Sequence, residues 1–349
     1  MVGIRKYLEM VLTKGDIIKM KKIKNLIKDL SDFIPYLHKY YEGMITIFML
    51  HRVYPFEANK LYPNENMKVS PEFLEKFIIE LKSKGYEFIS LDKVYEILKN
   101  GEKVKKKIVF TLDDGYLDNY TIAYPIFKKY NVPFAIYVTT SFPEHEAILW
   151  WYVLEDLILS HESLKLCNRK TYECKSKKQK ENVFLEIRKI ILSFKKENFL
   201  DSLNELFCYY DIDWFSKNRE LCMSWDQIIE LSKDELCTIG GHTKNHYALN
   251  RLSVEEVKSE ILEANKLIEK KIGKKIEHFA YPFGSRIEIG QREFNIVKSF
   301  GFKTVTTTRR GTIYKEHKDY LECLPRIMLT EGFNLKTIGH IRRHRIATV

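Results

Sequence analysis

The sequence predicts an α/β fold, a distorted (β/α)7-8 TIM-like barrel with an all-helical insertion and an N-terminal helical extension. Short apolar runs typical of buried strands alternate with amphipathic helical segments along most of the chain. Cap residues bound several of these helices. One stretch, residues 145–222, breaks the alternation with long helical patterns and no clear strand. Repeated strand–helix units favour a parallel sheet, and seven or eight of them favour a closed barrel.

Residues 1–43 form the predicted basic helical extension, which precedes the barrel region at 44–349. Lysine and arginine outnumber acidic residues there, and isoleucines and leucines give the segment a rough apolar face. A face of this kind either docks on the body of the protein or lies on an anionic membrane surface.

The first half of the barrel is predicted from apolar runs and cap residues. Ser70 and Pro71 begin a helix that ends before Gly85, and Gly101 closes the next helix. The expected elements, in order, are strand 44–50, helix 70–85, strand 86–91, helix 91–101, strand 108–112, helix 118–130 and strand 134–139.

The second half follows the insertion, whose aromatic start at 149–158 either borders the site or packs in a core. A strand ends near Ile239, and Ser253 and Glu256 form a capping box at the start of a long helix. Two more strands are expected within 276–284 and 302–308.

Composition narrows the function classes. The chain has 349 residues, of which 45% are hydrophobic, and a formal charge of +11, which suits an anionic partner such as a membrane surface, an acidic glycan or nucleic acid. It lacks the arginine and aromatic platform of single-strand binders, so nucleic acid is not an expected partner. Its six cysteines contain no C-x-x-C pair and are expected to be free thiols in a reducing compartment. Without a secretory leader or a spanning segment, a cytoplasmic location is expected, with peripheral membrane contact through the basic N-terminus as a variant.

Polar residues with catalytic potential follow the predicted strands. His51 follows the first strand, Asp113 and Asp114 end another, and His242 and His246 follow the strand near residue 239. In a barrel of parallel strands the carboxyl ends gather at one rim, where the active sites of such folds lie. These side chains are therefore expected to meet.

Each of these features has an ordinary explanation when taken alone. Asp114-Gly115 could be a simple turn, and two histidines four residues apart occur often by chance. Together, two imidazoles and one carboxylate form a ligand set that leaves zinc with open positions. The combination favours a catalytic metal site.

Three segments resemble the motifs of a known family. "TLDDG" at 111–115, "HTKNH" at 242–246 and "AYPFG" at 280–284 are similar to the three motifs of the polysaccharide deacetylases, the NodB-homology or carbohydrate esterase family 4 enzymes. They occur in the family's order, and the resemblance runs from about residue 44 to 330, outside the insertion.

The resemblance implies a role for each matched residue. Asp114, His242 and His246 would bind a divalent metal, Zn²⁺ by ligand type, with Co²⁺ or Ni²⁺ as alternatives. Asp113 would be the general base. The remaining matched residues are Thr243, which would brace the histidine loop by a hydrogen bond, and Tyr281, Pro282 and Phe283, which would line the sugar groove.

The chain departs from the family in two places. Many members carry an arginine before the third motif, and Arg326 is the candidate replacement, grouped here with the substrate-binding residues. The late Leu-x-Leu-x-His segment that supplies the general acid is not evident, because His340 and His344 fit it poorly. One branch of the family has this acid near the front of the domain, and "MLHRV" resembles that stretch, so His51 is assigned as the general acid, with a buried structural histidine as the alternative.

The predicted function is a metal-dependent hydrolase that removes an N-acetyl group from a GlcNAc-type amino sugar in a glycan or glycan precursor and releases acetate. Asp113 would take a proton from water, and His51 would protonate the departing amine, which is a poor leaving group otherwise. One alternative is hydrolysis of another acyl or amide group, such as formyl, O-acetyl or a non-sugar amide. The other is a non-catalytic carbohydrate-binding protein.

Overall fold

The computed structural model of the chain describes residues 43–340. The predicted extension at 1–43 and its suggested membrane contact therefore lie outside the described residues, apart from Gly43, and so does His344. Among the helices of residues 43–340, none is both long and apolar enough to cross a bilayer.

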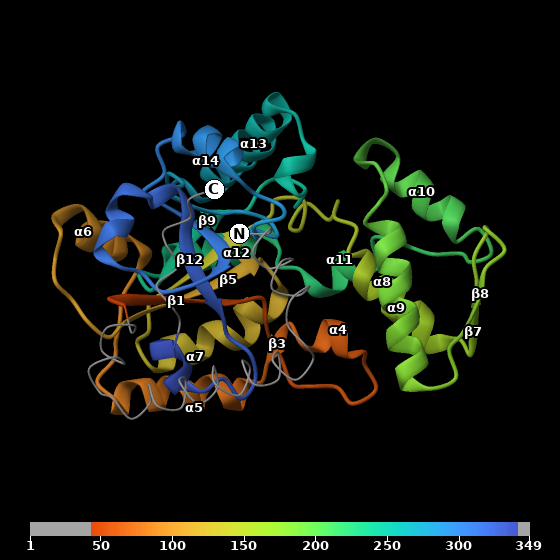
Figure 1. Cartoon of the computed structure of the whole chain (residues 1–349), viewed down its shortest axis with the longest axis horizontal. Coiled ribbons are helices and arrows are strands. Elements are labelled where there is room, and N and C mark those ends of the chain that lie inside the picture. The colour runs from red at the N-terminus through yellow and green to blue at the C-terminus, as the bar shows by residue number, and fades with distance from the viewer. Residues whose placement is uncertain (1–42, 341–349) are drawn as a thin grey trace, which may run out of the picture.

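Seven parallel strands close into a barrel, which confirms the predicted fold class (Figure 1). The closing pair is β1 with β5, in register from Ile45 opposite Lys107 to Leu50 opposite Leu112. A short strand, β4 (Glu87–Phe88), adds to β5 outside the ring. The ring order is β1 (Ile45–Leu50), β12 (Leu324–Met328), β11 (Thr304–Arg310), β10 (His278–Ala280), β9 (Cys237–Gly241), β6 (Phe134–Val138) and β5 (Lys107–Asp114).

Helices cover the outside of the barrel, with α5 and α7 on one side and α13 and α14 on the other in Figure 1. The predicted caps are present: Ser70 accepts a hydrogen bond from the Phe73 amide, and Ser253 and Glu256 form the capping box. The helices are α4 (Tyr62–Glu65), α5 (Pro71–Ser83), α6 (Leu91–Asn100), a π-helical turn η1 (Asn119–Ala123) that runs into α7 (Tyr124–Lys129), α12 (Trp225–Lys233), α13 (Val254–Ile272) and α14 (Gln291–Lys298).

Shorter elements connect these. They are β2 (Arg52–Val53), which pairs with β3 (Lys68–Val69), and the 3-10 helices η2 (Lys196–Asn198), η3 (Leu249–Arg251), η4 (Lys315–Asp319), η5 (Leu321–Cys323) and η6 (Leu335–His340).

Phenylalanines dominate the core on the side of α5 and α7. Phe48 and Phe110 stack with ring centroids 5.7 Å apart, and Phe127 and Phe134 stack at 4.7 Å. Each of these rings is almost fully buried, which contributes about 1.5–3 kcal/mol per side chain before conformational entropy is counted. This packing holds β1, β5 and β6 rigidly, and all three lead to the rim that carries the predicted site.

The insertion at 145–222, called the insertion lobe below, lies to one side of the barrel (Figure 1). It has its own hydrophobic core, built around Leu154, Phe184, Ile187 and Phe207. The elements of the lobe are α8 (Trp150–Ser160), β7 (Ser163–Lys165), β8 (Thr171–Glu173), α9 (Lys177–Ile191), η2, α10 (Phe199–Leu206) and α11 (Ser216–Leu221).

The prediction of an all-helical insertion is wrong, because β7 and β8 form a small antiparallel hairpin. Alternate residues of this segment are buried, among them Leu164, Leu166 and Tyr172, which is the period of a half-buried strand. Arg169 turns the hairpin with φ 66°. The alternation is present in the sequence but is too short to stand out beside the long helices.

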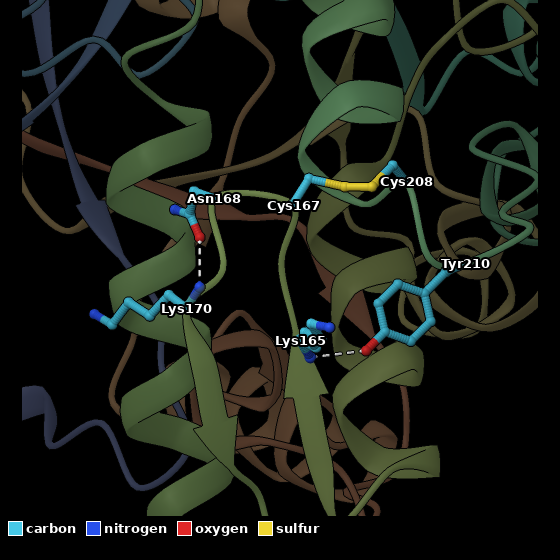
Figure 2. Close-up of a disulfide and its surroundings, with 6 residues drawn as sticks. All are labelled: Lys165, Cys167, Asn168, Lys170, Cys208 and Tyr210. Atoms are coloured by element: carbon cyan, nitrogen blue, oxygen red, sulfur yellow. Dashed lines mark hydrogen bonds between the residues drawn. A yellow bond between two sulfur atoms is a disulfide. The ribbon is translucent and has the colours of Figure 1, made fainter.

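A disulfide joins Cys167 to Cys208 within the lobe (Figure 2), so the prediction of six free thiols is wrong for this pair. The Cα atoms are 6.0 Å apart. Around the bridge, the Cys167 amide donates to the Leu206 carbonyl, and the Lys165 amide donates to the Tyr210 hydroxyl (2.9 Å). The two cysteines are separated by 41 positions, so their spacing did not indicate that they meet. The other four cysteines are free and buried.

Candidate metal centre at the barrel rim

Three side chains from two strand ends converge at the rim. Asp114 is the last residue of β5, and His242 and His246 follow β9. The Nε2 atoms of both histidines lie 3.3 Å from Oδ1 of Asp114. One ligand atom from each residue lies within 4.8 Å of the others. The structure thus brings together the three residues that the sequence grouped as metal ligands.

The donor set fits a divalent cation. Oδ1 of Asp114 is buried and accepts no hydrogen bond from the described residues. An unpaired carboxylate oxygen inside a protein is costly, and a cation between it and the two imidazoles would satisfy it. One carboxylate and two histidines are ligands that zinc accepts, with positions left open for water or substrate.

Hydrogen bonds orient the two imidazoles. His242 is 1% exposed, and its Nδ1–H donates to the Ala280 carbonyl at 2.8 Å, which leaves the Nε2 lone pair directed at Asp114. The His246 amide donates to Oγ1 of Thr243 at 3.1 Å. This is the hydrogen bond expected of Thr243 within the histidine loop.

Burial and the nearby carboxylate act differently on the two histidines. Burial lowers the pKa of His246 to about 4, because the attraction of Asp114 only partly offsets it. Burial also acts to lower the pKa of His242, but the carboxylates of Asp114 and Asp113 together outweigh burial and the pKa is raised. A neutral imidazole is the form that binds metal, so His246 is already in its ligand form near neutral pH.

Unusual backbone conformations aim these residues. Asp114 has φ 79° and the following Gly115 has φ 95°, so β5 ends in a left-handed turn that points consecutive carboxylates in different directions. The glycines before His242 are required by space. A Cβ on Gly240 would lie 2.6 Å from the Tyr137 ring, and one on Gly241 would lie 2.3 Å from the Asn265 side chain.

Asp113 faces Arg326 rather than the two histidines. The guanidinium of Arg326 donates two parallel hydrogen bonds to the carboxylate, at 2.6 and 2.7 Å, and both side chains are buried. Burial acts to raise the pKa of Asp113. The charges of Arg326 and His242 act in the opposite direction and outweigh burial, so the pKa is lowered. The carboxylate is therefore held in its ionised form.

The grouping of Arg326 with the substrate-binding residues is wrong. The residue is 1% exposed, and its other hydrogen bonds go to the Thr307 carbonyl and the Thr111 hydroxyl. A guanidinium enclosed in this way cannot contact a sugar. It acts on Asp113 instead, as an arginine clamp that reaches from β12 past β1 to β5.

The third motif is only partly at the surface. Tyr281 is fully buried, and its hydroxyl donates to the Glu322 carbonyl at 3.0 Å, so its predicted place in the sugar groove is wrong. Pro282 is also buried. Phe283 is 41% exposed, and its ring centroid lies 4.9 Å from that of His246. Of these three residues, Phe283 is the one placed to touch a ligand.

His51 follows β1 and lies partly exposed at the same rim. The Asn119 amide group donates to its backbone carbonyl at 2.9 Å, which fixes the position of the residue. Nδ1 of His51 is buried and has no hydrogen-bond partner among the described residues. Burial acts to raise the pKa of Asp114, but His246, His242 and, to a smaller extent, the nearby His51 ring lower it more, so the net shift is downward.

The sequence analysis missed a buried cluster around Arg52. Its Nε donates to Asp118 at 2.6 Å, and its guanidinium lies 5.3 Å from the Tyr116 ring and 5.4 Å from the Tyr152 ring. Burial raises the pKa of Tyr152 to about 12, so its hydroxyl stays protonated. Tyr152 belongs to α8, so the insertion lobe packs on the residue that follows His51. The neighbouring arginine in "MLHRV" was the available signal.

Comparisons with known proteins bear on the family of the chain. The family model described as polysaccharide deacetylase matches residues 100–305. A search of curated proteins finds no match.

Solved structures share the fold at low sequence identity. The deacetylase PplD of Streptococcus pyogenes, solved in complex with acetate, is 20% identical, with a TM-score of 0.55 over 82% of this chain and 92% of its own. IcaB from Ammonifex degensii is 18% identical, with a TM-score of 0.52 over the same shares. A de-N-acetylase from Aggregatibacter actinomycetemcomitans is 16% identical, with a TM-score of 0.53 over 85% of this chain and 99% of its own. With its motifs at the barrel rim and the family match over more than half of its length, the chain belongs to the polysaccharide deacetylase family.

Proposed function

We propose that the protein is a metal-dependent hydrolase that removes the N-acetyl group from a GlcNAc-type amino sugar in a glycan or glycan precursor. One observation carries the proposal: a buried, unpaired carboxylate oxygen on Asp114 faces two histidines, beside a second aspartate held by Arg326. Family membership and the solved de-N-acetylase and acetate-bound deacetylase support this choice of reaction.

Asp114, His242 and His246 would hold the metal. A divalent ion bound there would polarise the acetyl carbonyl and make a water molecule more acidic. The ligand types favour Zn²⁺, and Co²⁺ or Ni²⁺ would accept the same donors.

Asp113 is the proposed general base. Its bonds to Arg326 fix the carboxylate and keep it ionised, yet each carboxylate oxygen retains a lone pair that can accept a proton from water. The left-handed backbone at Asp114 separates the directions of the two carboxylates. One can therefore face the ion while its neighbour faces water, which explains why adjacent acids have different roles.

His51 is the proposed general acid. An amide nitrogen leaves only when it is protonated, so the reaction needs a donor on the leaving-group side. The imidazole of His51 has a buried nitrogen without a partner, and Asn119 fixes its backbone. Phe283, exposed beside His246, is the proposed contact for the sugar.

Two other functions use the same residues. Hydrolysis of a formyl, O-acetyl or non-sugar amide group would need the same metal ligands and base. A carbohydrate-binding protein without activity would not need the Asp113–Arg326 pair, which is intact and buried here. A cytoplasmic location is retained only as a prediction, and the Cys167–Cys208 disulfide weakens it because such bonds are typical of oxidising compartments.

The deciding experiment measures acetate release from a panel of N-acetylated sugars, with and without a chelator. We expect release that the chelator abolishes and that Zn²⁺ or Co²⁺ restores. Asp113→Asn should lose most of this activity while keeping its metal. Metal-independent release, or full activity in Asp113→Asn, would contradict the proposed mechanism.

A second experiment separates the acid from the base. Nitrophenyl acetate has a leaving group that departs without protonation, whereas an amide does not. We therefore expect His51→Ala to reduce amide hydrolysis much more than ester hydrolysis, and Asp113→Asn to reduce both. Equal losses on the two substrates in His51→Ala would exclude His51 as the acid.

A further inference from the structure

A pocket of about 600 Å³ opens beside the metal centre, between the barrel rim and the insertion lobe. His246 and Phe283 line it on the side of the barrel, so the pocket reaches the proposed reaction centre directly. Small-molecule sites usually measure about 300–1,000 Å³, which is far more than an acetyl group occupies. The pocket therefore has room for parts of a substrate beyond the group that reacts.

The wall opposite the rim comes from the insertion lobe. Trp151 of α8 and Phe194, which follows α9, line this wall, and both are partly exposed. Phe283 and Tyr247 lie on the barrel side of the same pocket. Aromatic side chains on both sides suit a ring-shaped ligand with apolar faces and polar edges, which is the surface of a pyranose sugar.

The charges around the pocket nearly cancel. The lining includes four basic and three acidic side chains: Arg188, Lys195, Lys196, Arg251, Glu146, Glu197 and Glu288. A site for a polyanion would carry a clear excess of positive charge. The pocket therefore fits an uncharged glycan better than a phosphorylated or acidic one.

Contacts at both ends fix the lobe against the barrel. At one end Tyr152 packs on Arg52, and the Leu61 amide donates to Glu155 of α8 at 2.7 Å. At the other end the Arg251 guanidinium donates to the Leu192 carbonyl, and Lys196 pairs with Glu256. These contacts hold the walls of the pocket in place, so binding need not order them.

We infer that the insertion lobe supplies the binding site for the neighbouring sugar unit of an uncharged glycan chain, with Trp151 and Phe194 as its contacts. The family already implies a polysaccharide substrate, and the inference adds that this lobe holds the sugar unit beside the reacting one. This inference rests on the proposed deacetylase function, which places the reacting unit at the metal centre. It adds that the insertion lobe determines which lengths of glycan chain are good substrates.

The test measures kcat/KM of the metal-loaded protein on N-acetylglucosamine and on its di-, tri- and tetrasaccharides in more than one glycosidic linkage. In at least one linkage series, we expect kcat/KM to be about tenfold or more higher for the disaccharide than for the monosaccharide. A rise of this size is what favourable contacts with one more sugar unit would give. Trp151→Ala and Phe194→Ala should each reduce the ratio of oligosaccharide to monosaccharide activity. Trp151→Ala preserves the backbone carbonyl that accepts from Asn64.

Tyr209→Ala is the matched control. Tyr209 is an exposed aromatic residue of the same lobe (54% exposed) and does not line the pocket. Its activity ratio should equal that of the unmodified protein, and thermal melting should show that all three variants are folded. Equal kcat/KM for monosaccharide and oligosaccharides, or an unchanged ratio in both Trp151→Ala and Phe194→Ala, would overturn the inference.

Binding separates this inference from the proposed function. If no sugar in the panel yields acetate, the proposed function fails. Calorimetry with the trisaccharide and the full chain then decides the inference. Binding that weakens in Trp151→Ala but not in Tyr209→Ala would support the lobe as a glycan site, and absence of binding would exclude it.

Discussion

The barrel rim and the insertion lobe are stabilised by different kinds of interaction. At the rim, ionisable side chains form a buried pair, Asp113 with Arg326, and a largely buried triad, Asp114 with two histidines. The lobe holds its shape with an apolar core and one disulfide. Its polar groups, such as Arg188 and Lys195, are mostly at the surface.

This difference shows which parts of the molecule tolerate change. A buried charge is stable only with its partner, so the rim requires particular residues at particular positions. An apolar core accepts many sequences of similar volume. The rim is therefore suited to fixed chemistry, and the lobe is suited to varying the shape of the pocket beside it.

The largest expected effect follows from removing a metal ligand. We expect His242→Ala to lower acetate release by about a thousandfold, because polarisation of the carbonyl and activation of water are lost together. Metal content measured by atomic emission should fall with it. His145→Ala, which removes an exposed histidine outside the centre, is the control. Undiminished metal content in His242→Ala would show that the ion is held elsewhere.

The next effect concerns the arginine clamp. Arg326→Met leaves Asp113 buried without its partner, and we expect the free energy of unfolding to fall by about 3–5 kcal/mol. Urea unfolding measures this change. Adding Asp113→Asn to the same chain should recover part of the loss, because the unpaired charge is then removed. If Arg326→Met alone were as stable as the unmodified protein, Asp113 and Arg326 would not form a buried ion pair.

A smaller effect, confined to the insertion lobe, is expected when the disulfide is removed. Replacing Cys167 and Cys208 by serine should cost about 2–4 kcal/mol of stability. Hydrogen exchange should rise within 145–222 and stay unchanged in the barrel strands. A reductant added to the unmodified protein should give the same pattern. Increased exchange in β5 or β9 would show that the two regions unfold together.

The smallest expected effect is loss of one hydrogen bond in the histidine loop. Thr243→Val keeps the branched shape but removes the hydroxyl that accepts from the His246 amide, at a cost of about 1–3 kcal/mol. We expect metal affinity to fall by about tenfold, as is typical when a group supporting a ligand is lost. Thr121→Val, at an exposed position, is the control. Equal metal affinity in both variants would show that the Thr243 hydroxyl does not support the loop.

The sequence was sufficient to predict the barrel and the convergence of its three candidate metal ligands. Asp114, His242 and His246 follow strands that can be recognised from local patterns, and the geometry of a parallel barrel brings strand ends together. For these three residues it was enough to know which strand each one follows. A residue at the carboxyl end of a barrel strand lies at the rim, whatever contacts distant segments make.

Prediction failed where the outcome depended on contacts between distant segments. The Arg326 side chain could point to the groove or into the barrel, and only the position of Asp113 on β5, two strands away around the barrel, decides this. Tyr281 was placed in the groove although the next residue but one, Phe283, has the exposed ring. The Cys167–Cys208 bond depends on how the hairpin meets α10, which no local pattern encodes.

The contact between Arg52 and Tyr152 has a consequence for how this chain could be shortened or recombined. The lobe starts and ends near the rim and has its own core, which makes it look like a separable module. Excising the lobe would expose the Arg52 guanidinium, which pairs with Asp118. Arg52 is the residue that follows His51. A trimmed barrel would thus need a new cover at that place, and the lobe is better regarded as an integral part of the barrel rim than as a removable appendage.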